Sequence, residues 1–296
     1  MLLSLQVLDL LEISGSQSRA ARSLAMHQTT VSRSYWDLAE QFRLQPGRDR
    51  QTVCRWGVST SLRFLRLACR AHRLDDGRLR LATDALHQSL LDGLPGVLQV
   101  PPCFRSAEDW AALVEHGVID GAIVSSLCHD QQLARPQLPC WRGVRVIALG
   151  TLMLQLVCHQ RWAAAWQGDV LLPARTVMPL LHQQLEACVS SLERPSRAWQ
   201  DPQVWLTQLQ RRPVALPLCP ALAPRRWWQE QGLVAAWDQP LLQERLWLLL
   251  PEDLELSPAA EATLRVIHRR VIRSAAAGSQ APVLMDLDPA ADQHVA

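Results

Sequence analysis

The polar side chains between residues 28 and 33 have types and a spacing that suit contacts with DNA. Gln, Thr and Ser side chains can hydrogen-bond base edges, and Arg binds phosphate oxygens well. The amino-terminal end of a recognition helix is the part that reaches the major groove. We therefore expect one group of side chains to face bases and Arg33 to contact phosphate. The base-facing group is Gln28, Thr29, Thr30 and Ser32.

Two short helices joined by a turn would present these side chains. The first helix is predicted from about Ser18, as its hydroxyl N-cap, to Ala25, with small alanines on its inner side. The second helix is predicted to begin near Gln28. Its apolar residues recur at i, i+4 and i+7, which places them on one inner face. They are Val31, Tyr35 and Leu38. The pattern also fits an ordinary solvated helix pair in an all-α domain.

Three linked segments carry a family resemblance. They are the run from Gly15 to Leu24 (GSQSRAARSL), the run from Gln28 to Arg33 (QTTVSR) and Leu38 with Glu40. Together they resemble the DNA-binding domain of LysR-type transcriptional regulators. The resemblance implies a winged helix-turn-helix head over residues 1–56 and a sequence-specific regulator of transcription that binds double-stranded DNA. It also implies control by a small-molecule effector.

The charge of the chain is divided unevenly. Of 296 residues with a formal net charge of +2, the first 80 carry 13 Arg against 7 Asp and Glu, a net of +6, so the remainder carries −4. A basic head on a mildly acidic body suits a polyanion partner, although a solvated loop with ordinary charges is an alternative for part of it. Around the turn signal Pro46-Gly47, where a wing would lie, we expect phosphate contacts. With Arg19 and Arg33, the expected phosphate contacts are Arg48 and Arg50.

A long helix is predicted over residues 57–76. Val58, Leu62, Leu65 and Cys69 recur at helical spacing and form an apolar stripe that needs a partner surface. In the resembled family this is the linker helix, which pairs antiparallel with its copy, so we expect a homodimer or homotetramer. Packing of the stripe back onto the chain's own head is the alternative.

Residues 77–274 alternate short strands with helices. The order predicts an α/β domain with helices on the faces of a sheet, and a second lobe is expected from about Arg142. The elements expected include helices over residues 85–94 and 178–192 and two successive strands over residues 144–150 and 152–158. The resemblance implies a two-lobed, periplasmic-binding-protein-like effector domain. Small molecules bind such domains at the carboxyl ends of strands, so we expect effector contacts from Thr83, Ser125, Ser126 and Thr176, which could equally be turn and cap residues. Residues 275–296 are predicted to be a flexible tail.

No catalytic motif, phosphate loop or metal-ligand spacing stands out in the sequence. We expect no enzyme activity, no catalytic residues, no cofactor and no metal. Eight Cys without a C-x-x-C pair favour reduced thiols, and neither a leader nor a membrane-length apolar run is evident, so a cytoplasmic location is expected. Because Gln17, His27 and Trp36 depart from the family pattern, the alternative is a ligand-binding or protein-interaction module whose head no longer binds DNA.

Overall fold

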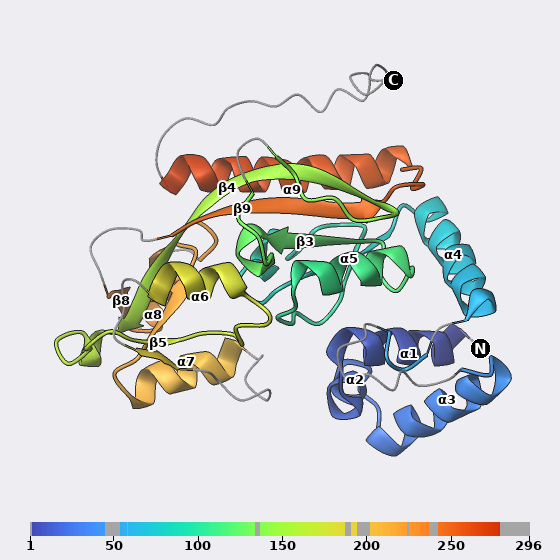
Figure 1. Cartoon of the computed structure of the whole chain (residues 1–296), viewed down its shortest axis with the longest axis horizontal. Coiled ribbons are helices and arrows are strands. Elements are labelled where there is room, and N and C mark those ends of the chain that lie inside the picture. The colour runs from blue at the N-terminus through green and yellow to red at the C-terminus, as the bar shows by residue number, and fades with distance from the viewer. Residues whose placement is uncertain are drawn as a thin grey trace.

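The computed structural model describes residues 2–44, 54–57, 59–133, 137–186, 191–193, 202–223, 225–236 and 242–278. It has three parts: a helical head, a connecting helix and an α/β body (Figure 1). The body carries its helices on a mixed sheet, which confirms the predicted α/β class. None of the helices among these residues is long and apolar enough to cross a bilayer.

The head consists of α1 (Leu2–Ser14), α2 (Gln17–Ser23) and α3 (Gln28–Gln41). The start of α3 lies where the sequence predicted it, and the three predicted inward residues, Val31, Tyr35 and Leu38, are buried. The predicted cap of α2 was wrong. Ser16 is the N-cap, and its hydroxyl accepts from the Arg19 backbone N–H, so α2 begins earlier than expected.

The connecting helix α4 runs from Thr60 to Asp75, within the predicted range. Its N-cap is Ser59, whose hydroxyl accepts from the Leu62 backbone N–H. The face that α4 buries in its own chain carries Leu62, Arg66 and Arg70. The apolar residues of α4 are therefore divided between two faces: Leu62 is buried, whereas Phe64 is 66% exposed.

Lobe 1 of the body contains β1 (Leu79–Thr83), β2 (Val97–Gln99), β3 (Gly121–Ser125) and α5 (Ala107–Glu115). Its three strands are parallel in the order β2-β1-β3, as the βαβ pattern predicted. The predicted first crossover helix, residues 85–94, was wrong, because only η1 (Gln88–Leu90) is helical there. Asp84 accepts from the backbone N–H groups of Leu86 and His87, which sets a turn instead of a regular helix.

Two long antiparallel strands connect the lobes. They are β4 (Val144–His159) and β9 (Leu242–Pro251), which pair side by side beneath α9 (Pro258–Gly278) in Figure 1. The sequence predicted two strands where β4 is one, because the chain continues through a register shift at Gly150, whose φ is +141°. α9 extends into the predicted tail as far as Gly278, so the expected tail boundary at residue 275 was too early.

Lobe 2 completes the sheet, whose described strands run in the order β2-β1-β3-β9-β4-β7-β5-β6, with β8 also paired to β4. One prediction was wrong here: the helix expected over residues 178–192 ends at Glu186, and residues 191–193 form β6. The elements of lobe 2 are η3 (Gln160–Trp162), β5 (Asp169–Leu171), α6 (Pro179–Glu186), β6 (Ser191–Glu193), α7 (Pro202–Arg211), β7 (Ala215–Leu218), α8 (Arg225–Glu230) and β8 (Leu233–Ala235).

Candidate DNA interface and interlobe hollows

The amino-terminal part of α3 presents a polar surface to solvent. Gln28, Thr29, Thr30 and Arg33 are exposed, and Ser32 is half-buried. The opposite face of the helix is anchored, because Tyr35 is buried and its hydroxyl donates to the Trp56 carbonyl over 3.0 Å. The structure therefore brings all five predicted residues onto one accessible helix end and fixes the rotation of that helix.

A pair of side-chain hydrogen bonds orients Gln28. The Ser18 hydroxyl donates to Gln28 Oε1 over 3.2 Å, and Gln28 Nε2 donates to Gln17 Oε1 over 3.4 Å. The N-cap of α3, His27, makes no side-chain capping bond. Gln17 and Ser18 thus act on the start of α3 from α2, a role that sequence reasoning missed because the bonding partners are ten and eleven residues apart.

The predicted phosphate contacts have different surroundings. Arg33 is exposed, but Arg19 is half-buried. Burial lowers the pKa of the Arg19 guanidinium, and Cys103 and Arg105 of lobe 1 lie close enough to influence it electrostatically. Arg48 and Arg50, with the predicted wing, lie outside the described residues. Arg22, in the last turn of α2, is exposed and was not among the predicted contacts.

A buried carboxylate of the head joins α1 to α4 and lobe 1. Asp9 of α1 accepts from Arg66 Nε over 2.8 Å and from Arg80 Nη1 over 2.7 Å. Asp9 is almost completely buried, and so is Arg66. The side chain of Asp9 therefore holds one arginine of α4 and one of β1 at the same point of the interior.

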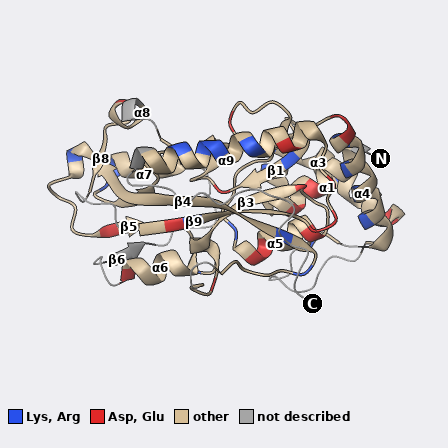
Figure 2. Cartoon of the chain, turned by 90° about the horizontal axis from the view of Figure 1, so that it is seen from above, with Lys and Arg blue, Asp and Glu red and all other residues tan. Residues whose placement is uncertain are grey.

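A second buried carboxylate, that of Asp120, joins α4 to the start of β3. It accepts from Arg73 over 3.0 and 2.5 Å, from Arg70 over 3.4 Å, and from the Arg80 backbone N–H over 2.8 Å. Part of the basic charge of the first 80 residues is therefore neutralised by buried carboxylates and does not reach the surface. Figure 2 also shows basic residues along α9 of the body, so arginine is not confined to the head and α4.

The carboxyl end of α1 also contacts lobe 1. Arg105 donates to the carbonyls of Glu12 and Ile13, where the last carbonyls of a helix lack partners within the helix. The Glu12 side chain accepts from the Trp56 backbone N–H over 2.8 Å. Burial raises the pKa of Glu12 to about 7, against the lowering effects of that hydrogen bond and of nearby arginines. The buried apolar side chains of the head and of α5 form one continuous core, so head and lobe 1 are packed as a unit.

The expected effector residues do not form one site. Thr83 and Ser125 are buried, and the Ser125 hydroxyl accepts from the Leu127 backbone N–H. Ser126 lines a hollow between the lobes, and Thr176 is exposed and lines neither hollow described below. Thr83 and Ser125 do end strands, as the sequence predicted. The Ser125 hydroxyl, however, caps the turn that follows its strand.

A hollow of about 420 Å³ lies between the loops of lobe 1 and lobe 2. We call it the aromatic hollow, because Phe104 and Trp205 stack at its wall with ring centroids 5.0 Å apart. Leucines and Trp227 cover most of the remaining surface, and Asp92 is the charged residue among its described lining residues. No sequence pattern pointed to this hollow, since Phe104 and Trp205 are far apart along the chain. It is lined by Ala85, Leu86, Gln88, Ser89, Asp92, Phe104, Trp205, Leu206, Leu216, Leu218, Cys219, Leu222, Ala223, Trp227 and Leu233.

A buried histidine connects lobe 1 to the crossing strand β9. His87 Nδ1 lies 2.8 Å from Asp84 Oδ1, and Nε2 lies 2.9 Å from Glu244 Oε1. Burial alone lowers the pKa of His87, but the two carboxylates outweigh it and raise the pKa well above its usual value. A doubly protonated ring can donate to both carboxylates at once. This triad ties the turn after β1 to β9.

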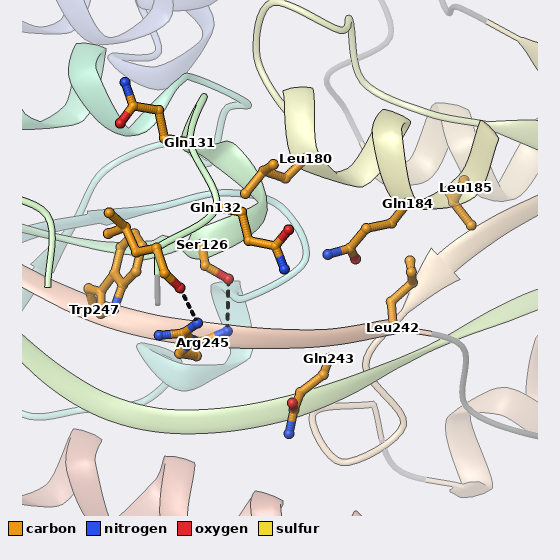
Figure 3. A pocket seen from close by; sticks show the side chains of 11 residues that line it. Ser126, Gln131, Gln132, Leu180, Gln184, Leu185, Leu242, Gln243, Arg245 and Trp247 are labelled. Carbon is orange, nitrogen blue, oxygen red and sulfur yellow. Dashed lines mark hydrogen bonds between the residues drawn. The ribbon is translucent and has the colours of Figure 1, made fainter. Parts of the chain in front are cut away.

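A second hollow, of about 400 Å³, lies between the lobes beside β9. Side chains from alternate positions of β9, namely Gln243, Arg245 and Trp247, contribute to its lining. Figure 3 shows Gln132 of lobe 1 and Gln184 of α6 extending toward one another across it. We call it the polar hollow. It is lined by Ser126, Gln131, Gln132, Leu133, Leu180, Gln184, Leu185, Leu242, Gln243, Arg245 and Trp247.

One group of side chains has the types that bind metals. Atoms of Glu108, His129 and Asp130 lie within 4.8 Å of one another. The carboxylates, however, face opposite ring nitrogens: Glu108 lies 3.6 Å from Nε2 and Asp130 lies 3.5 Å from Nδ1. The three ligand atoms lie close enough together for one ion, although exposed acidic groups such as Asp130 commonly cluster without one.

Fold and sites together define an architecture: a helix-turn-helix head with an exposed polar amino-terminal end on α3, carried on a two-lobed α/β body with hollows between its lobes. No family model matches the sequence, and no curated protein matches it.

Solved structures resemble the chain over most of its length. The crystal structure of ArgP from Mycobacterium tuberculosis is 19% identical, covers 90% of this chain and 96% of its own, and has a TM-score of 0.47. CbnR, a LysR family transcriptional regulator, is 12% identical, with 90% and 98% covered and a TM-score of 0.49. Full-length LysG from Corynebacterium glutamicum with bound effector Arg is 13% identical, with 91% and 97% covered and a TM-score of 0.47.

Proposed function

We propose that this protein is a DNA-binding transcriptional regulator controlled by a small-molecule effector. The observation that carries the proposal is the two-sided character of α3. One face is locked into the head core through Val31 and Tyr35, while Gln28, Thr29 and Arg33 remain exposed at the end that would enter the major groove. A helix held in one rotation offers the same polar side chains to every groove it meets, as sequence-specific contact requires.

Phosphate contact by Arg33 provides the direct test. Replacing Arg33 with Ala removes about one phosphate charge contact, so the slope of log affinity against log salt concentration should become shallower by about one, for specific and random duplexes alike. Electrophoretic mobility shift titrations at several salt concentrations measure this slope. Arg78→Ala is the matched control, because Arg78 is exposed in the loop before β1. Equal slopes for the Arg33 and Arg78 variants would contradict the proposal.

The effector is proposed to bind the aromatic hollow. Its wall contains Phe104 of lobe 1 and Trp205 of lobe 2, so a ligand there contacts both lobes. Such a ligand stabilises the arrangement of the lobes to which it binds best. The lining is mostly apolar and carries a carboxylate at Asp92, which favours a neutral, ring-containing molecule. Because the head shares a core with lobe 1, a change in the orientation of lobe 1 relative to lobe 2 would also reorient α3 relative to lobe 2.

A second copy of the chain is proposed to cover the outer face of α4. Phe64, Ala68 and Ala71 lie at i, i+4 and i+7 and are all exposed, so they form one apolar strip. The two small alanines leave room for another helix to approach beside the Phe64 ring. The strip is separate from the face that buries Leu62 and Arg66 in the same chain. A regulator that reads two half-sites needs two heads related by a dyad, which this contact would provide.

One observation favours a second candidate function. Trp36 lies on the outward face of α3, three residues after Arg33, and is 59% exposed. A large exposed aromatic ring on this face also suits a protein partner, so the head could serve a protein-interaction module. Retention of the full chain on immobilised random duplex DNA at low salt separates the two functions. Failure of retention would favour the protein-interaction module.

A further inference from the structure

The outer face of α9 carries opposite charges at its two ends. The second half of the helix, from Leu264 to Gly278, contains four Arg and no Asp or Glu. Three of these arginines are exposed and lie at i, i+4 and i+8, so they form one basic strip along the solvent side. They are Arg265, Arg269 and Arg273. Arg270 faces the body instead, where it donates to three main-chain carbonyls in and after η1.

The start of α9 is acidic. Glu261 is exposed in the first turn, and its carboxylate accepts from Arg265 over 2.9 Å. Three further exposed carboxylates lie in the short segment before the helix, namely Glu252, Asp253 and Glu255. Figure 2 views this side of the molecule and shows acidic residues near the start of α9 and basic residues along the rest.

We propose that this face is an interface with a second copy of the chain, in which the two α9 helices lie antiparallel about a dyad close to Ala262. Such a contact is self-complementary, because the basic half of each copy meets the acidic start of the other. Arg265 then lies beside Glu261 of the second copy. At a rise of 1.5 Å per residue, Arg269 and Arg273 lie about 10 and 16 Å from Ala262 along the helix, and the acidic segment begins on the opposite side, beyond about 6 Å.

Charge complementarity favours a second copy over a nucleic acid as the occupant of this face. A duplex lying along the basic strip would run onto the four carboxylates at the start of α9, which repel phosphate. An antiparallel copy meets opposite charge at both ends. Ala262 is exposed and small, so it leaves room for the two helices to approach each other at the dyad.

The contact is weak when it acts alone. Exposed ion pairs each contribute little to stability, and salt screens them. Association through α9 becomes effective when another interface already holds two copies close together. Because α4 and α9 are separate elements (Figure 1), contacts at both would join more than two copies. The α9 contact requires neither the proposed α4 contact nor DNA binding.

Sedimentation velocity of the full chain tests the interface with two charge-reversed variants. The basic-reversed variant carries Arg269→Glu and Arg273→Glu, and the acidic-reversed variant carries Glu252→Arg and Glu255→Arg. Below about 0.05 M salt the natural chain should form a larger species than either variant, and each variant should associate at least about tenfold more weakly. A one-to-one mixture of the two variants should restore the larger species, because each variant supplies the charge that complements the other.

Arg161→Glu with Arg211→Glu is the matched control. It changes the net charge by the same amount as the basic-reversed variant, on exposed residues of lobe 2 outside α9, and should sediment like the natural chain. Asp253 is left unchanged in all variants, because it also acts electrostatically on Arg70. If circular dichroism shows that one variant does not fold, the other is still compared with the natural chain at low and high salt.

Two results would each overturn the proposal: equal sedimentation of the natural chain and a folded charge-reversed variant at low salt, or a mixture that sediments like its separate components. Unchanged sedimentation of the basic-reversed variant with weaker retention on duplex DNA would assign the strip to DNA instead. A failed mixture would also be the result if the segment 279–296, with its three Asp, occupied the strip. DNA binding by Arg33 is tested separately by the salt-dependence experiment.

Discussion

Glu12 offers a quantitative test of how the head is packed onto lobe 1. The residue is 3% exposed and its carboxylate accepts from the Trp56 backbone N–H. Burial raises its pKa from 4.5 to about 7 in the folded protein. A carboxyl group whose folded pKa is raised favours folding while it is protonated. Its contribution is therefore complete below pH 4.5 and is lost as the pH rises through about 7.

The size of the effect follows from the shift. A change of one pKa unit corresponds to about 1.36 kcal/mol, so Glu12 should lower the free energy of unfolding by about 3 kcal/mol between pH 4.5 and pH 8. Glu12→Gln cannot ionise and should lack this part of the pH dependence. Relative to the natural chain, the variant should gain stability steadily as the pH rises from about 5 to about 8.

Urea unfolding followed by circular dichroism at several pH values measures the difference between the two proteins. Taking the difference cancels the contributions of other titrating groups, including His87. Glu40→Gln is the control, because Glu40 is an exposed carboxylate in the same head. Parallel stability curves for the natural chain and the Glu12 variant between about pH 5 and pH 8 would refute the assignment of Glu12 as a buried, proton-binding group.

The buried carboxylate of Asp120, the exposed face of α4 and the aromatic hollow each allow a further test. Asp120→Asn leaves Arg70 and Arg73 without their buried carboxylate, so it should cost about 3–5 kcal/mol in urea unfolding, whereas exposed Asp76→Asn should cost little; a loss under about 1 kcal/mol would contradict the role of the pair. Phe64→Glu should shift sedimentation velocity profiles toward the monomer, with Arg63→Glu as the exposed control, and unchanged association would exclude α4 as the contact. Ala223→Phe should fill the aromatic hollow and abolish stabilisation by indole in thermal unfolding, and retained stabilisation would place indole elsewhere.

Local sequence patterns predicted α3 well. The alternation of apolar and polar residues from Gln28 to Leu38 determines which face is buried, because side chains at i, i+4 and i+7 share one side of any helix. The parallel order of β1, β2 and β3 was predictable for a similar reason, since short strands alternating with helices leave few arrangements. One prediction failed where a local pattern met a distant partner: in the turn after Asp84 that replaced a helix, His87 contacts Glu244 of β9.

The sequence by itself determined many of the elements and the exposed end of α3, because these depend on residues within a few positions of one another. Only the tertiary structure decided the partners of Asp120. Its residue type suits a turn, but its carboxylate accepts hydrogen bonds from Arg70 and Arg73 of α4, which lie far earlier in the chain. The tertiary structure also decided that the two hollows exist. Each is assembled from segments of lobe 1 and lobe 2 that meet only after the sheet has formed, and no local periodicity encodes such a meeting.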